Sequence, residues 1–346
     1  MIGKEKIRKS VIDMFKVNMG LKSDEKVLVV TDAPTLGDWK EKTVDKLTDF
    51  TQRTLLAKTV SEIAAEGFPE CPVEFYVYPS VGSHGAELGA EAAEKLKTAD
   101  VLIAITSYSL SHTKAREDAT KAKVRVASMP LFLADMFYPK GPMSADYTKV
   151  KEETEKLSKL LTEANEATVK TSAGTDITFS LKGRTGLVDA GIFAETGAFG
   201  NLPSGEAYIA PLEGTANGKV VVEKGWHTGL TENMTLVFKR GKVIEVTGGD
   251  NVGDEFRKLL KPGVDEEPYK SRRNLAELGI GTNPYAKRPD NVLEAEKIKG
   301  TVHIAIGDNA HMGGKISADL HQDFVLPKPD LYLDGKPVMR SGKTVV

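Results

Sequence analysis

Three histidines and three aspartates gather in one short stretch near the end of the chain. The stretch reads TVHIAIGDNAHMGGKISADLHQDF and contains His303, Asp308, His311, Asp319, His321 and Asp323. A histidine taken alone is most often a surface residue or a hydrogen-bonded core residue. Imidazole and carboxylate groups that cluster are, however, common ligands of divalent metal ions. The stretch therefore predicts a metal site.

His321 and Asp323 are separated by a single residue. In an extended strand residues i and i+2 project from the same face, so one strand can point both side chains at one ion. Zn²⁺, Mn²⁺, Co²⁺ and Fe²⁺ all accept such ligands, at distances of about 2.0–2.2 Å. The His-x-Asp spacing alone is a weak signal, and His303, in the strand-like segment 301–306, is a third candidate ligand.

Two glutamates are further candidates. Glu206 follows a Pro-Ser-Gly turn and leads into an apolar segment, and Glu277 is framed by small and apolar residues in AELGIGTN. Burying an ionised carboxylate is costly unless it is paired or coordinates a metal. For either residue alone a salt bridge or a solvated turn is the simpler interpretation.

Four motifs carry a resemblance to a known family. In order, NLPSGE, AELGIGTN, GTVHIAIGDN and LHQDF resemble the thermophilic aminopeptidases of the aminopeptidase T type. The resemblance implies a metallopeptidase that removes N-terminal residues from short peptides through a metal-activated water, with two Zn²⁺ or Co²⁺ ions per chain. It also implies a homodimer. The ligands that it implies are Glu206, Glu277, His303, His321 and Asp323.

Within this resemblance the glutamates have particular roles. Glu277 would bridge the two ions, and Glu206 or Glu277 would transfer the proton. The peptidases also place a tyrosine shortly after the first ligand histidine, where this sequence reads DNAHMGG and has none. His311 and Asp308 are the candidates to replace it, as ligands or as proton-transfer groups.

A second resemblance points to another reaction. The ring-opening dihydroxypyridine dioxygenases are similar to these peptidases, but hold one non-haem Fe²⁺ with two histidines and one aspartate. His303, His321 and Asp323 would supply that set, with open positions for substrate and O₂. Glu206 and Glu277 would then lie around the metal or act as acid and base. A metal-binding homologue without catalysis is the third hypothesis.

The elements that must position these residues differ between the two halves of the chain. Short apolar segments alternate with helical ones from residue 26 to residue 127, which predicts a parallel, helix-flanked sheet. A helix over 147–165 ends this pattern, and hairpin-like strand pairs follow. We therefore expect an α/β protein with an N-terminal parallel α/β domain over 1–165. A C-terminal β-rich α+β domain over 166–346 would carry the metal site.

Smaller features complete the prediction. Beyond the hairpins, a helix is expected over 291–298. Thr31-Asp32-Ala33-Pro34 follows the first strand and is interpreted as a turn, although it could line a cleft. The composition includes 47 basic and 49 acidic residues and one cysteine, Cys71. Such a charge balance does not recruit nucleic acid or membranes, and the single cysteine fits a cytoplasmic protein.

Overall fold

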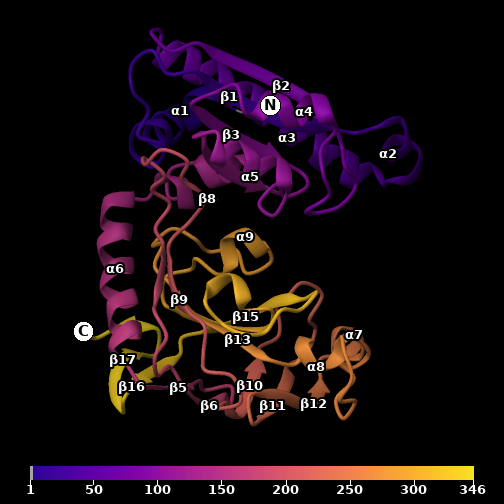
Figure 1. The fold of residues 1–346 in the computed structure, drawn as a ribbon, viewed down its shortest axis with the longest axis vertical. Coiled ribbons are helices and arrows are strands. Elements are labelled where there is room, and N and C mark those ends of the chain that lie inside the picture. The colour runs from indigo at the N-terminus through magenta and orange to yellow at the C-terminus, as the bar shows by residue number, and fades with distance from the viewer. Residues whose placement is uncertain (1–2) are drawn as a thin grey trace. The chain divides into compact units, whose positions relative to one another are not determined.

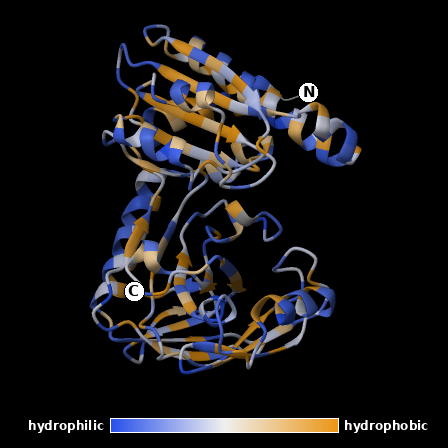
Figure 2. Ribbon diagram, turned by 45° about the vertical axis from the view of Figure 1, so that its right-hand side comes forward, coloured by the Kyte–Doolittle hydropathy of each residue, from blue (hydrophilic) through white to orange (hydrophobic). Residues whose placement is uncertain are grey.

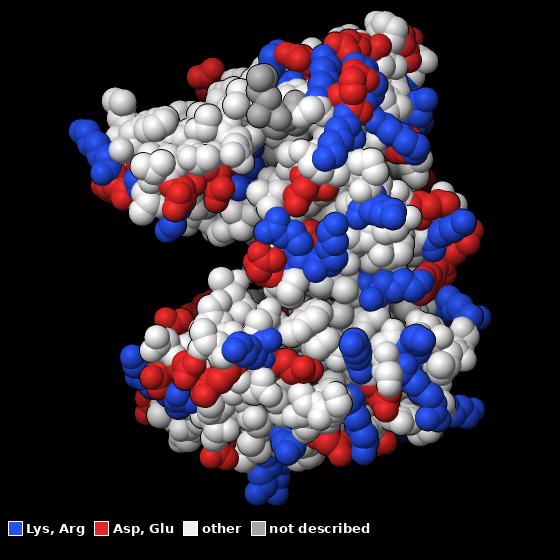
Figure 3. Space-filling view, turned by 180° about the vertical axis from the view of Figure 1, so that it is seen from behind, with Lys and Arg blue, Asp and Glu red and all other residues white. Residues whose placement is uncertain are grey.

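The computed structural model describes residues 3–346, which form two compact units (Figure 1). The first unit comprises Met1–Thr148 and Gly191–Ser204, and the second comprises Lys149–Ala190 and Gly205–Val346. Each unit has its own cluster of buried apolar side chains. On the face shown in Figure 3, acidic and basic side chains are interspersed over the surface.

The first unit is built on a five-stranded parallel sheet of order β2-β1-β3-β4-β8. Its strands are β1 (Val27–Ala33), β2 (Val73–Pro79), β3 (Val101–Thr106), β4 (Arg125–Pro130) and β8 (Phe199–Asn201). Its helices are α1 (Lys4–Asp13), α2 (Leu36–Glu41), α3 (Val44–Gly67), α4 (Ala90–Leu96), α5 (Lys114–Lys121) and the short η1 (Met14–Asn18), η2 (Ala134–Phe137) and η3 (Pro142–Ser144). Strands β3 and β4 are buried throughout, as expected for parallel strands covered on both faces.

The second unit contains two antiparallel sheets. The larger has the order β12-β11-β10-β6-β5-β16-β17-β18, with strands β5 (Glu166–Lys170), β6 (Asp176–Ser180), β10 (Asn217–Val222), β11 (Met234–Lys239), β12 (Lys242–Gly248), β16 (Asp330–Leu333), β17 (Lys336–Arg340) and β18 (Lys343–Thr344). The smaller has the order β15-β14-β13-β9-β7, with β7 (Leu187–Asp189), β9 (Glu206–Ile209), β13 (Leu275–Gly281), β14 (Thr301–Gly307) and β15 (His321–Pro327). The helices of the second unit are α6 (Tyr147–Glu163), α7 (Asp250–Leu260), α8 (Tyr269–Arg272), α9 (Val292–Ala295) and η4 (Ala310–Met312).

One apolar core joins the two sheets of the second unit. It includes Leu278 of β13, Ile304 of β14 and Phe324 of β15 from the smaller sheet, with Val220 and Leu236 from the larger one. Apolar residues recur along the strands of both units in Figure 2. Because side chains alternate along a strand, the neighbours of these core residues point to the opposite face of the smaller sheet.

The predicted fold class is confirmed: a parallel α/β sheet is followed by a β-rich unit. The helix expected over 291–298 is limited to α9. Residues 296–299 continue as turns, in which Ile298 forms an isolated bridge with Asn283. In the described part of the chain, no helix is long and apolar enough to cross a membrane.

Candidate metal centre

Strand alternation brings all five predicted ligands to one face of the smaller sheet. The residues beside them in sequence, such as Ala207, Leu278 and Phe324, belong to the core, so the ligands point away from it. The four strands involved, β15, β14, β13 and β9, are neighbours in the sheet. These strands carry, in that order, His321 with Asp323, His303, Glu277 and Glu206.

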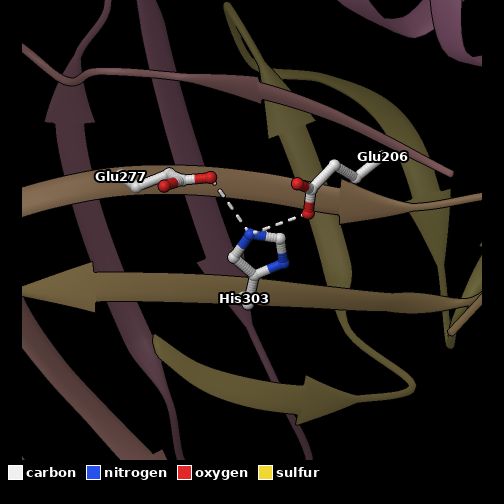
Figure 4. A group of neighbouring side chains, drawn as sticks. All are labelled: Glu206, Glu277 and His303. Atoms are coloured by element: carbon white, nitrogen blue, oxygen red, sulfur yellow. Dashed lines mark hydrogen bonds and ion pairs between the residues drawn. The ribbon is translucent and has the colours of Figure 1, made fainter. Parts of the chain in front are cut away.

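Three of these residues form a first donor group, shown in Figure 4. His303 Nε2 lies 3.1 Å from Glu277 Oε1 and 3.5 Å from Glu206 Oε2. One donor atom of each residue lies within 4.8 Å of the other two, and all three residues are buried. We call this set the histidine-303 group.

Glu277 also belongs to a second donor group. His321 Nε2 lies 3.1 Å from Glu277 Oε2 and 3.5 Å from Asp323 Oδ1. The donor atoms of these three residues again lie within 4.8 Å of one another. We call this set the histidine-321 group; Glu277 thus joins the two groups through its two oxygens.

The distances in both groups match those of a coordination shell. With bonds of about 2.0–2.2 Å, neighbouring ligand atoms around one ion lie about 3.0–3.5 Å apart. The nitrogen–oxygen distances of 3.1 and 3.5 Å in each group fall in this range. Either group can therefore hold a divalent cation. The predicted set of His303, His321 and Asp323 is divided between the two.

Two glycines of β13 make room for this arrangement. Gly279 pairs with both His303 and Tyr208, and a Cβ on Gly279 would overlap the His303 ring. The missing side chain lets the imidazole extend across β13 toward Glu206. A Cβ on Gly281 would overlap the carbonyl of Ile298, so this glycine lets segment 296–299 approach the strand.

The second histidine is oriented by the loop that precedes it. His321 Nδ1 lies 2.8 Å from the carbonyl oxygen of Asp308. A carbonyl only accepts hydrogen bonds, so Nδ1 carries a proton and donates it. In the neutral ring this leaves the Nε2 lone pair facing Glu277 and Asp323, which is how a metal-binding histidine is usually held.

The hydrogen-bonding capacity of His303 is less completely used than that of His321. Its Nδ1 and Glu206 Oε2 are buried atoms without a hydrogen-bond partner. Burial acts to lower the pKa of His303, but the hydrogen bond to Glu277 and the charge of Glu206 outweigh it and raise that pKa to about 9. Acidic groups thus surround a buried imidazole, and the donor types and unpaired atoms fit a cation at this face of the sheet.

Sequence reasoning missed a lysine next to this site. Lys297 Nζ lies 2.5 Å from Glu206 Oε1, 3.1 Å from Glu296 Oε2 and 3.7 Å from Asp189 Oδ2. Only 5% of the Lys297 side chain is exposed. The sequence signal was weak, because Glu296 and Lys297 lie within a stretch predicted as an ordinary helix.

The two substitute candidates lie at the edge of the centre, outside both donor groups. His311 Nδ1 lies 2.6 Å from Asp308 Oδ2, and the ring centroids of His311 and His321 are 5.4 Å apart. About half of the His311 side chain is exposed. The Asp308–His311 pair thus lies next to His321, and part of it is open to solvent.

Comparisons with known proteins identify relatives over nearly the whole chain. A model of the family described as 2,5-dihydroxypyridine 5,6-dioxygenase matches residues 11–346. A 2,5-dihydroxypyridine 5,6-dioxygenase from Pseudomonas putida is 27% identical over 272 residues, 73% of either chain.

Two solved structures share the fold. The dihydroxypyridine dioxygenase from Pseudomonas putida superposes with a TM-score of 0.72 at 18% identity, covering 100% of this chain and 99% of that one. AmpT from Thermus thermophilus superposes with a TM-score of 0.62 at 16% identity, covering 99% and 100%.

These matches correct the leading prediction of the sequence analysis. The expectation of a metallo-aminopeptidase, and with it of a hydrolase or protease, is wrong, because the family model that spans the chain is that of an oxygenase. The short-peptide substrate loses its support for the same reason. Carboxylates and imidazoles bind the metals of both enzyme classes, so ligand types alone do not decide the reaction.

Proposed function

Because the chain belongs to the 2,5-dihydroxypyridine 5,6-dioxygenase family, we propose that it is an Fe²⁺-dependent oxygenase that opens the ring of a dihydroxypyridine. The match over residues 11–346 is the observation that carries this proposal. The cluster of imidazoles and carboxylates supports it, because these are suitable ligands for Fe²⁺.

Within this proposal the histidine-321 group holds one iron ion. Glu277, His321 and Asp323 would be its ligands, and His303 would hold Glu277 through the 3.1 Å contact to Oε1. The triad from the resemblance is thus revised, with Glu277 in the place of His303. Fe²⁺ bound to three protein ligands would supply open coordination positions for the ring and O₂.

Proton transfer falls to residues of the chain. We assign it to His311, because the contact of its Nδ1 with Asp308 orients the ring and leaves Nε2 available to a hydroxyl of the substrate. Asp308 also holds His321 through its carbonyl oxygen, so one residue positions both imidazoles. Removing the hydroxyl proton makes the ring more electron-rich and easier to oxidise.

The test is a reaction of the purified chain with 2,5-dihydroxypyridine. Protein loaded anaerobically with Fe²⁺ is mixed with substrate and O₂, and loss of the ring absorbance is followed together with O₂ consumption. We expect the amount of substrate lost to equal the amount of O₂ consumed. Tight Fe²⁺ binding without turnover of any dihydroxypyridine isomer would overturn the proposal in favour of a metal-binding homologue. Protein with Zn²⁺ in place of Fe²⁺ is the matched control and should not consume O₂.

A further inference from the structure

The histidine-303 group has the spacing of a metal site, but the Lys297 ammonium already forms an ion pair with one of its carboxylates. Lys297 Nζ is 2.5 Å from Glu206 Oε1, on the carboxylate whose other oxygen faces His303. An ammonium is a compact charge with three donors and no acceptor, so it competes directly with a metal for a carboxylate. The two donor groups are therefore not equivalent.

The backbone fixes Lys297 in this position. Asn283 N–H donates to the Lys297 carbonyl at 2.9 Å, and Lys299 N–H donates to the Asn283 carbonyl at 3.1 Å. Gly281 lets this segment pack directly against β13. The lysine is thus held at Glu206 by an ordered, nearly buried segment, unlike a surface side chain that swings aside at little cost.

The ammonium has further carboxylate partners that hold it at this place. Lys297 Nζ lies 3.1 Å from Glu296 Oε2 and 3.7 Å from Asp189 Oδ2, in addition to Glu206. A metal ion bound at Glu206 would bring its positive charge close to this nearly buried ammonium, and like charges at such distances repel. Without the Lys297 ammonium, this repulsion is absent.

We propose that Lys297 takes the place of a second metal ion at Glu206 and His303, and so limits the centre to one ion. The inference rests on the proposed metal site in the histidine-321 group. It predicts that removal of the ammonium opens the histidine-303 group to a divalent metal. Lys297 is a positioning residue in this account, holding Glu206 without touching the reacting atoms.

Co²⁺ titration of the metal-free full-length chain tests the proposal. We expect wild type to bind one Co²⁺ per chain and Lys297→Met to bind two, measured by calorimetry and by metal content after gel filtration. Lys299→Met is the matched control: Lys299 lies two residues away, has 44% of its side chain exposed and pairs with Glu153. This variant should bind one Co²⁺. One ion in folded Lys297→Met, or two in wild type, would overturn the proposal.

A second variant keeps the test decisive if Lys297→Met does not fold. Glu206→Gln removes the closest of the three carboxylates around Lys297 and should leave one Co²⁺ per chain. Loss of this Co²⁺ would show that Glu206 holds the metal itself, which contradicts the inference. A wild-type chain that binds no Co²⁺ would overturn the metal site of the proposed function, and this inference with it.

Discussion

Glu277 is the residue on which the metal centre depends most. Its Oε1 faces His303 and its Oε2 faces His321, each at 3.1 Å. Burial opposes ionisation, but the hydrogen bonds from the two histidines outweigh it and lower the pKa of Glu277. The carboxylate is thus held ionised, which is the form that binds a metal.

Replacing Gly279 by alanine should disturb the centre without touching any ligand. The added Cβ would overlap the His303 ring, which must then turn away from Glu277. Since residues that orient a ligand typically contribute 10–100-fold in affinity, we expect Co²⁺ affinity to fall by about that factor. The measurement is calorimetric titration of the metal-free protein.

Gly89→Ala is the matched control for this prediction. Gly89 has a φ of −58° and open space at the position of a Cβ. Its replacement should leave Co²⁺ affinity unchanged. An unchanged affinity in Gly279→Ala would mean that the His303 ring does not support the metal site.

His311→Gln should separate proton transfer from metal binding. Glutamine retains a hydrogen bond to Asp308 but cannot exchange a proton, and general bases typically contribute 10²–10⁴-fold to rate. We expect turnover of 2,5-dihydroxypyridine to fall about 100-fold while iron content stays at the wild-type level. A variant with wild-type turnover would remove His311 from the mechanism; a variant without iron would make it a structural residue of the loop.

For single residues, the sequence predicts which side chains share one face of a strand, but not which side chains come together through packing of distant segments. His321 and Asp323 were predictable as a pair, because the alternation of a strand puts them on one face. Lys297 was not predictable, since it reaches Glu206 only because Gly281 lets its segment approach β13. No spacing in the sequence records that contact.

Among the elements, the loop over 308–320 is the one that connects and orients the ligand strands β14 and β15. Glu213 fastens it: Oε1 accepts hydrogen bonds from Asn309 Nδ2 at 3.0 Å and from Lys315 N–H at 2.7 Å. Arg184 pairs with the other oxygen of Glu213 and donates to the carbonyl of Gly313. A single carboxylate thus binds both Asn309 and Lys315, on either side of the turn in the loop that carries Asp308 and His311.

Glu213→Ala should loosen this loop. Two backbone or amide donors would lose a charged partner, a loss worth about 1.5–3 kcal/mol for each such bond. We expect amide hydrogen exchange over 308–320 to become at least tenfold faster, while exchange in β13 stays unchanged. Glu255→Ala, at an exposed position of α7, is the control. Wild-type exchange in the loop of Glu213→Ala would show that other contacts hold it.

The helix expected over 291–298 shows why element boundaries escaped prediction. Its start was readable, since the Asn291 side chain accepts a hydrogen bond from Glu294 N–H as a helix cap. Its end was not. The helix stops at Ala295 because Lys297 and Lys299 form backbone hydrogen bonds with Asn283 instead. This competition involves Asn283, a residue distant in sequence that follows the end of β13, and local propensity carries no information about it.

For the whole molecule, the architecture was more predictable than the reaction. Buried parallel strands and exposed hairpins have different hydrophobic periods, so the α/β and β-rich parts could be told apart. The reaction was mistaken because imidazole and carboxylate ligands suit a hydrolase and an oxygenase alike. The absent tyrosine was a sequence feature that argued against the peptidase.

The two units should respond differently to metal. All donor residues lie in the second unit, so Co²⁺ at 100 times its dissociation constant should stabilise that unit by about 2.7 kcal/mol. For a unit of this size the shift is roughly 5–10 °C. We expect calorimetry to show two unfolding transitions, with only one raised by Co²⁺. A single transition that moves as a whole would mean that the units unfold together.

Asp32, in the first unit, should mark the transition that Co²⁺ leaves unchanged. This aspartate at the end of β1 is 1% exposed; its Oδ1 accepts a hydrogen bond from Ser107 N–H at 2.7 Å, and its Oδ2 has no partner. Burial raises the pKa of Asp32, more than the hydrogen bond from Ser107 and the charge of Arg53 lower it. The folded protein therefore keeps a proton that the unfolded chain releases near pH 4.

The sign of the pH effect follows from this proton. The stability that it contributes is fully present below about pH 4 and is lost as the pH rises through the raised folded pKa. Asp32→Asn removes the titration and keeps an acceptor for Ser107. From pH 4 to pH 7 we expect the metal-independent transition of wild type to fall relative to that of Asp32→Asn, by about 1.4 kcal/mol for each unit by which the pKa is raised. If the stability of this transition changed with pH equally in wild type and in Asp32→Asn, the pKa of Asp32 would be the same in the folded and the unfolded chain. If the Co²⁺-dependent transition moved instead, Asp32 would act on the metal-binding unit.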